Sequence, residues 1–179
     1  MLFFLIVILM QNFQDVFIFS RERIISGEIW RIWSGQLVHS NYSHLLMNTA
    51  GFAILLIIYK NTFSNIQLLI RIAYLSSCIG LGLYIFNPEI QLYAGLSGII
   101  YGLFTIAAIQ AYFQNKHLLA YPIFIAISGK IFWENVDGSI NNTSSSIINA
   151  HVASDAHLYG YISALILELF IAIHKKGAN

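Results

Sequence analysis

The sequence has little charge: Asp, Glu, Lys and Arg make up 9% of its 179 residues, whereas soluble domains carry about a quarter. The formal net charge is only +1, so the chain lacks the strong positive field that would attract nucleic acid. Hydrophobic residues make up 58%, and the mean hydropathy is +0.70. Such a chain cannot cover itself with polar groups in water. We therefore expect a membrane protein that is surrounded by lipid and has no nucleic-acid partner.

Cysteine is nearly absent too. The single cysteine, Cys78, excludes an intrachain disulfide, and its position in an apolar run gives no indication of the redox compartment. No internal repeat, low-complexity tract or change of composition divides the chain. We expect a single membrane domain over residues 1–179.

Long apolar runs dominate what is present. A membrane-spanning helix needs about 20 mostly apolar residues. The sequence contains six candidates, at residues 2–19, 43–60, 67–86, 96–114, 117–134 and 152–174. The apolar start of the chain lacks the basic region and small-residue cleavage site of a signal peptide, so we assign it to the first span. These runs predict an all-α, polytopic bundle of six transmembrane helices.

Two connections between the predicted spans are unusual. Residues 20–42 form a long, aromatic connection, in which Trp30 and Trp33 beside Arg31 suit a segment lying in the membrane interface. Residues 135–151 are rich in Asn, Ser and Gly, which predicts a polar loop.

The distribution of basic residues predicts how the bundle crosses the membrane. Basic residues without acidic partners in the same loops collect at one set of helix ends: Lys60, Arg71, Lys116, Lys175 and Lys176. An excess of Lys and Arg marks the cytoplasmic side, so these ends and both termini are expected in the cytoplasm. The second, fourth and sixth spans then run from the outside inwards.

Those three spans each carry polar residues near the outer end. The second has His44 and Asn48, the fourth has Ser97 and the sixth has His157, so all four are expected at a similar depth. An ionisable residue inside a membrane is a functional candidate by default. A serine and a histidine that meet are the minimum for nucleophilic acyl transfer. The sequence therefore predicts a catalytic site close to the outer surface.

Ser97 lies between Gly95 and Gly98. Glycines beside a nucleophile let the backbone approach the substrate and leave an N–H group free for a developing oxyanion. The alternative is that Gly98 and Gly102, four residues apart, form a small-residue packing face and that Ser97 is an ordinary membrane serine. Both readings can hold, because close packing of the fourth span on the sixth would bring Ser97 near its histidine.

His157 is followed by Gly160 and Ala164, which lie on the same helical face. The alternative is an interfacial histidine that points to water. Asp155 projects to a different side of the helix, so we expect a serine–histidine dyad without a third member. Tyr101, one turn after Ser97, could stack on the imidazole or simply pack.

His44 and Asn48 share one helical face, and both side chains can donate hydrogen bonds to an oxyanion. The alternatives are an interhelical polar clamp or a metal pair. His39 is the only plausible third ligand, and no carboxylate or cysteine stands at ligand spacing. We therefore expect no metal and no cofactor, and we read His39 as an extra polar group near the site.

Four features in this order resemble the rhomboid family of intramembrane serine proteases: Trp30-Arg31, His44 with Asn48, Gly95-Leu96-Ser97-Gly98 with Tyr101, and Ala156-His157-Leu158-Tyr159-Gly160. The resemblance covers about residues 1–176 and implies a six-helix rhomboid core. The combined pattern is specific, although no single piece is. Rhomboids often have a second glycine at the position of Ala164, and alanine is still small enough for close packing.

The resemblance also implies a role for each residue. Ser97 would be the nucleophile and His157 the general base. His44, Asn48 and the Ser97 backbone N–H would form the oxyanion site, while Tyr101 would pack on His157. The 20–42 segment would be a partly embedded first loop, and the fifth span with the 135–151 loop would form the lateral gate and cap.

Within that family, the chain looks more like the rhombosortase branch. The similarity lies in the run from Gly27 to His39, the short N-terminus and Asp155-Ala156-His157. It implies cleavage of the Gly-rich C-terminal sorting tail of exported proteins (GlyGly-CTERM processing) in the inner membrane of Gram-negative bacteria. The active site would open to the periplasm, and the partners would be lipid and a transmembrane or C-terminal tail segment of the substrate.

Three alternatives stay open. The chain could be a general rhomboid protease for single-span substrates. It could be a rhomboid-like protein that binds membrane helices without cleaving them, although such proteins usually lose the serine or histidine. A small transporter or channel would instead predict internal repeats or polar residues throughout the membrane depth.

Overall fold

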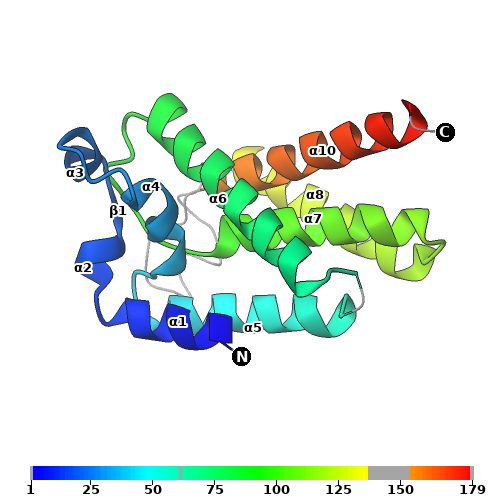
Figure 1. Cartoon of the computed structure of the whole chain (residues 1–179), viewed down its shortest axis with the longest axis horizontal. Coiled ribbons are helices and arrows are strands. Elements are labelled where there is room, and N and C mark those ends of the chain that lie inside the picture. Colours follow the sequence, from blue (N-terminus) through cyan, green and yellow to red (C-terminus); the bar gives the residue numbers. More distant parts are fainter. Residues whose placement is uncertain (1, 61, 137–153, 178–179) are drawn as a thin grey trace.

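The computed structural model describes residues 2–60, 62–136 and 154–177. Long helices dominate this part of the chain (Figure 1), in the order α5 (Tyr42–Ile58), α6 (Asn65–Phe86), α7 (Ser97–Phe113), α8 (His117–Val136) and α10 (Ser154–Gly177). Each corresponds to one of the predicted spans. Within these ranges the chain is mostly helical, and an all-α description omits one antiparallel pair of two-residue strands, β1 (Phe19–Ser20) and β2 (Leu92–Tyr93).

The prediction of one first span over residues 2–19 is wrong. The chain instead forms α1 (Leu2–Gln11), the short helix α2 (Gln14–Phe17) and then β1. At 1.5 Å per residue, α1 reaches only about half of a hydrocarbon core roughly 30 Å thick. Polar residues cause the break. Gln11 turns inwards, where its side chain accepts from the His39 backbone N–H and donates to the His39 carbonyl, both at 2.8 Å.

The structure does not support a count of six spans. Within the described residues, only α6 and α10 are long and apolar enough to cross a membrane by themselves. A third candidate is the pair Arg31–Leu37 and Tyr42–Ile58, which is bent by 86°. Helix α7 is apolar but has 17 residues. Other helices cover most of α7. This helix therefore does not need the roughly 20 residues that a lipid-exposed helix needs to cross the hydrocarbon core.

Helix α7 lies at the centre of the bundle. It packs most extensively against α10 and α8 and also contacts α6 and α5. Its fully buried side chains include Ile99, Leu103 and Ile106. This central position explains why α7 carries so few polar residues along its length.

Glycines bring α7 and α10 into backbone contact. A Cβ atom added to Gly160 would clash with the Gly98 carbonyl oxygen, and one on Gly98 would lie 2.6 Å from the Ala156 carbonyl oxygen. A Cβ on Gly102 would lie 2.9 Å from the Gly160 carbonyl oxygen. The predicted small-residue packing face is therefore confirmed. Ala164 is fully buried, so alanine is accommodated on the same face of α10.

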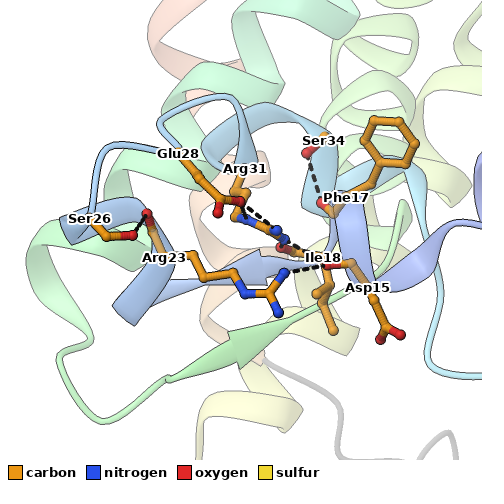
Figure 2. Close-up of polar contacts among 8 residues, drawn as sticks. All are labelled: Asp15, Phe17, Ile18, Arg23, Ser26, Glu28, Arg31 and Ser34. Carbon is orange, nitrogen blue, oxygen red and sulfur yellow. Dashed lines mark hydrogen bonds and ion pairs between the residues drawn. The ribbon is translucent and has the colours of Figure 1, made fainter.

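The 20–42 connection is a folded segment with α3 (Arg21–Ile25), α4 (Arg31–Ser34) and the 3₁₀ helix η1 (Gly35–Leu37). Arg31 holds it from within, as Figure 2 shows. Its side chain is 1% exposed, donates to the carbonyls of Asp15 and Ile18 and pairs with Glu28 at 2.6 Å. Trp30 and Trp33 are exposed, as a segment in the membrane interface would require, whereas the guanidinium beside them is buried.

A second arginine joins this segment to the rest of the fold. Arg21 donates hydrogen bonds to four backbone carbonyls at and just after the end of α6: Leu83, Tyr84, Asn87 and Ile90. The β1–β2 pair, with Phe19 opposite Tyr93, lies beside it. Strand β2 leads directly into Gly95 and α7, so these contacts fix the chain that enters the candidate site.

Candidate active site

The structure brings the side chains of Ser97 and His157 together. Ser97 is the first residue of α7, and His157 lies in the first turn of α10. The Ser97 Oγ and His157 Nε2 atoms are 2.8 Å apart, within hydrogen-bond distance. His157 is 4% exposed, so the imidazole is a buried group and does not point to open water. The glycine contact between α7 and α10 makes this approach possible.

The other imidazole nitrogen, Nδ1 of His157, contacts a carboxylate that was not predicted from the sequence. His157 Nδ1 lies 2.7 Å from Oε2 of Glu134, whose side chain is fully buried near the end of α8. The serine–histidine pair expected from the sequence therefore has a carboxylate directly beside it. Helix α8 runs antiparallel to α7 and α10, so its last turn meets their first turns. Figure 1 shows these helices side by side.

One sequence signal could have pointed to Glu134. Lys130 and Glu134 stand four residues apart at one end of an otherwise apolar helix, and the structure pairs Lys130 Nζ with Glu134 Oε1 at 2.6 Å. A charge inside a membrane segment is a functional candidate. Neither residue was predicted to belong to the site, and Glu134 is 23 residues from His157 in the sequence.

Tyr101 covers the face of the imidazole. Its ring and that of His157 are stacked, with centroids 4.4 Å apart and an angle of 24° between their planes. Of the two readings given by the sequence, the structure shows the stacked one. The ring limits rotation of His157 while leaving both of its nitrogens on their polar partners.

His44, Asn48 and Gly95 come together next to Ser97. A Cβ atom on Gly95 would lie 2.7 Å from Cε1 of His44 and 3.8 Å from Nδ2 of Asn48. Gly95 also has a φ of +143°, which disfavours any other residue. Asn48 Nδ2 is buried and has no hydrogen-bond partner among the described residues. A buried donor without a partner is uncommon, and it is free to bind an acceptor from outside the protein.

His39 lies behind this group. Its fully buried ring packs edge-on against His44, with centroids 5.1 Å apart. Neither ring nitrogen of His39 has a hydrogen-bond partner in the described part of the chain. Ser40 Oγ lies 3.0 Å from Nδ1 of His44, which leaves Nε2 of His44 directed to the Gly95 side. His39 is thus near the site but not next to Ser97.

In this arrangement a serine hydroxyl contacts an imidazole, a carboxylate contacts the other side of the same ring, and an amide donor without a partner among the described residues lies nearby. These are the elements of serine-based acyl transfer. Residues 26–174 match the Rhomboid domain family. The chain belongs to the rhomboid family. This family consists of membrane-integral proteins and includes intramembrane serine proteases as well as inactive relatives.

A named relative supports the same assignment. The rhomboid chain is 24% identical over 153 residues to the "Putative rhomboid protease YdcA" of Bacillus subtilis (strain 168). The match covers 86% of this chain and 72% of that protein. All the candidate site residues of this rhomboid, from His39 to His157, lie inside the matched domain. The loop predicted over residues 135–151 as part of the gate and cap lies outside the described residues from residue 137 onwards.

Proposed function

We propose that this rhomboid is an intramembrane serine endopeptidase in which Ser97 is the nucleophile and His157 the general base. The 2.8 Å contact between Ser97 Oγ and His157 Nε2 carries the proposal. His157 takes the hydroxyl proton as Ser97 Oγ bonds to the scissile carbonyl carbon, and the carbonyl π electrons move to its oxygen. The oxyanion then re-forms the carbonyl while the peptide C–N bond breaks, and the imidazolium donates its proton to the leaving amine. A water molecule hydrolyses the resulting acyl-enzyme by the same route.

The oxyanion formed in this step needs donors. Asn48 Nδ2 has no partner among the described residues and lies beside Gly95, so it can donate to the developing negative charge. His44 and the backbone N–H of Ser97 complete the oxyanion site. The N-terminus of α7 adds a favourable field for an anion at Ser97.

The substrate is a transmembrane or C-terminal anchor segment that enters from lipid. The resemblance to rhombosortases favours the Gly-rich C-terminal sorting tail of an exported protein. Glycine disfavours a helix by about 1 kcal/mol per residue, so a Gly-rich stretch unwinds more readily and exposes its carbonyl to Ser97. The cell compartment implied by the same resemblance is the bacterial inner membrane, with the site open to the periplasm.

Labelling with a fluorophosphonate probe tests the nucleophile. We expect the purified, membrane-reconstituted protein to be labelled and to cleave a tailed substrate, and Ser97→Ala to lose both properties. Ser163→Ala is the control, because Ser163 is also buried in the bundle. The hydroxyl of Tyr74 donates a hydrogen bond to the backbone carbonyl of Ser163, which the substitution leaves in place. Labelling of Ser97→Ala as fast as the wild type would refute the assignment.

Comparison of two substrate classes tests the specificity. We expect a Gly-rich C-terminal tail to be cleaved faster than a generic single-span segment, with fragment masses placing the cut near the glycines. Equal rates would instead favour a general rhomboid protease. Binding of either segment without cleavage would favour a rhomboid-like protein that only holds membrane helices.

A further inference from the structure

The geometry around the imidazole extends beyond a serine–histidine pair. We propose that Glu134 is a positioning residue for His157, so that this rhomboid works with a triad of Ser97, His157 and Glu134. The inference rests on the proposed function and adds a third participant to it.

The two imidazole nitrogens of His157 contact different partners. Nε2 faces Ser97 Oγ at 2.8 Å, and Nδ1 faces Glu134 Oε2 at 2.7 Å. An ionised carboxylate can only accept a hydrogen bond, so the proton of neutral His157 is held on Nδ1. The lone pair on Nε2 then faces the serine hydroxyl, which is the tautomer that a general base requires.

Glu134 occupies a position that is unfavourable for a negative charge. Its carboxylate is fully buried and lies in the last turn of α8, where the helix dipole opposes a negative charge. A buried carboxylate at such a position lowers the stability of the fold unless it is paired. Lys130 and His157 each contact one of its oxygens. A structural role alone would be served as well by an uncharged residue here.

In the proposed reaction, a positive charge forms on His157. When His157 takes the serine proton, it becomes an imidazolium beside Glu134, and the attraction between the two favours that state. The carboxylate stays ionised throughout, and no proton passes to it. Lys130 is 38% exposed, so it can hold Glu134 in place while its own charge is partly compensated by solvent.

Replacement of the carboxylate by an amide gives the main test. The carboxamide of Glu134→Gln keeps the shape but can donate to Nδ1, which favours the wrong imidazole tautomer. We expect kcat/KM to fall by about 10²- to 10⁴-fold, with KM changing little and thermal unfolding unchanged or raised. The control is Glu168→Gln, because Glu168 is also buried in a helix and accepts from Gln110 at 2.9 Å. This control should keep wild-type activity, and a wild-type kcat/KM for Glu134→Gln would overturn the triad.

The pH dependence separates positioning from a packing role. Loss of the neighbouring anion disfavours the imidazolium, so the acidic limb of kcat/KM should move to lower pH by about one unit in Glu134→Ala. Glu134→Asp restores a carboxylate and should recover part of both the rate and the limb. Among the described residues, the titratable and charged groups near His157 are those of His44 on α5, Tyr101 on α7, Lys130 and Glu134 on α8 and Asp155 on α10. An unmoved acidic limb would mean that Glu134 only packs.

A measurement without catalysis distinguishes failure of this inference from failure of the proposed function. In the inactive Ser97→Ala protein, the protonation of His157 can be followed by NMR of the labelled imidazole, with and without Glu134→Gln. We expect the second substitution to lower the midpoint of that titration by about one pH unit. An unchanged midpoint overturns the positioning role whatever the protein cleaves. A shifted midpoint in a protein that cleaves no peptide and binds no probe supports the role of Glu134 and refutes the protease.

Discussion

The side-chain nitrogen of Asn48 is buried without a hydrogen-bond partner in the described part of the chain. Such a group lowers stability, because it loses its bonds to water and gains none in the protein. Asn48 lies beside Gly95, and in the proposed oxyanion site the oxyanion would supply the missing acceptor. Under that proposal, function and stability make opposite demands on this one side chain.

Substitution of Asn48 should reveal this opposition. We predict that Asn48→Ala and Asn48→Asp lower kcat by about 10²- to 10³-fold, because both remove the donor, while the Tm of Asn48→Ala stays equal or rises. Steady-state kinetics and thermal unfolding in detergent measure the two effects. Asn65→Ala, at an exposed position at the start of α6, should change neither. Retained kcat in both Asn48 variants would exclude Asn48 from the oxyanion site.

Single residues were predictable from sequence where a local spacing relates them. Tyr101 follows Ser97 by one helical turn, and His44 precedes Asn48 by one turn, so each pair was expected on one face. Glu134 was not predictable in this way, because its contact with His157 depends on how α8 packs against α10. The use of Arg31 as an internal anchor also escaped prediction, because besides Glu28 its partners are the backbone carbonyls of Asp15 and Ile18, which no local spacing relates to it.

At the scale of helices, backbone contact between α7 and α10 determines whether Ser97 and His157 meet. A methyl group on Gly160 would fall on the Gly98 carbonyl, so the two helices would have to separate. We predict that Gly160→Ala lowers the free energy of unfolding by about 1–3 kcal/mol and abolishes cleavage, as measured by denaturant unfolding and a substrate assay.

Gly129 provides the matched control for that substitution. It lies within α8, and a Cβ atom added there has nothing within 4 Å. Gly129→Ala should therefore leave cleavage intact and stabilise the helix by up to about 1 kcal/mol. Equal effects of the two substitutions would show that helix contact at Gly160 is not what matters.

The apolar runs predicted α5, α6, α7, α8 and α10 to within a few residues, because long hydrophobic segments have few alternatives to a helix in lipid. They failed for residues 2–19, where Gln11 makes a tertiary contact that no run length reveals. The count of six spans is not confirmed, because only two helices among the described residues, or three with the bent pair, are long and apolar enough to cross a membrane. The folded 20–42 segment needed long-range contacts that periodicity does not contain.

For the whole molecule, the charge distribution predicts one orientation in the membrane. Two exposed glutamines allow a test, because Gln114 follows α7 and Gln91 lies between α6 and β2. In a Cys78→Ser background, we predict that a membrane-impermeant maleimide labels Gln91→Cys in intact spheroplasts. Gln114→Cys should react only after permeabilisation. The reverse pattern would place Ser97 near the cytoplasmic surface and contradict the proposed periplasmic opening.

Arg21 anchors the segment before the candidate site to the end of α6 through neutral carbonyl oxygens. Uncharged acceptors do not titrate with acid, and salt screens their bonds far less than it screens exposed ion pairs. The hydrogen bonds of Arg21 should therefore persist when the acidity or the ionic strength of the surrounding medium changes. The segment that leads into α7 should keep its conformation under the same changes.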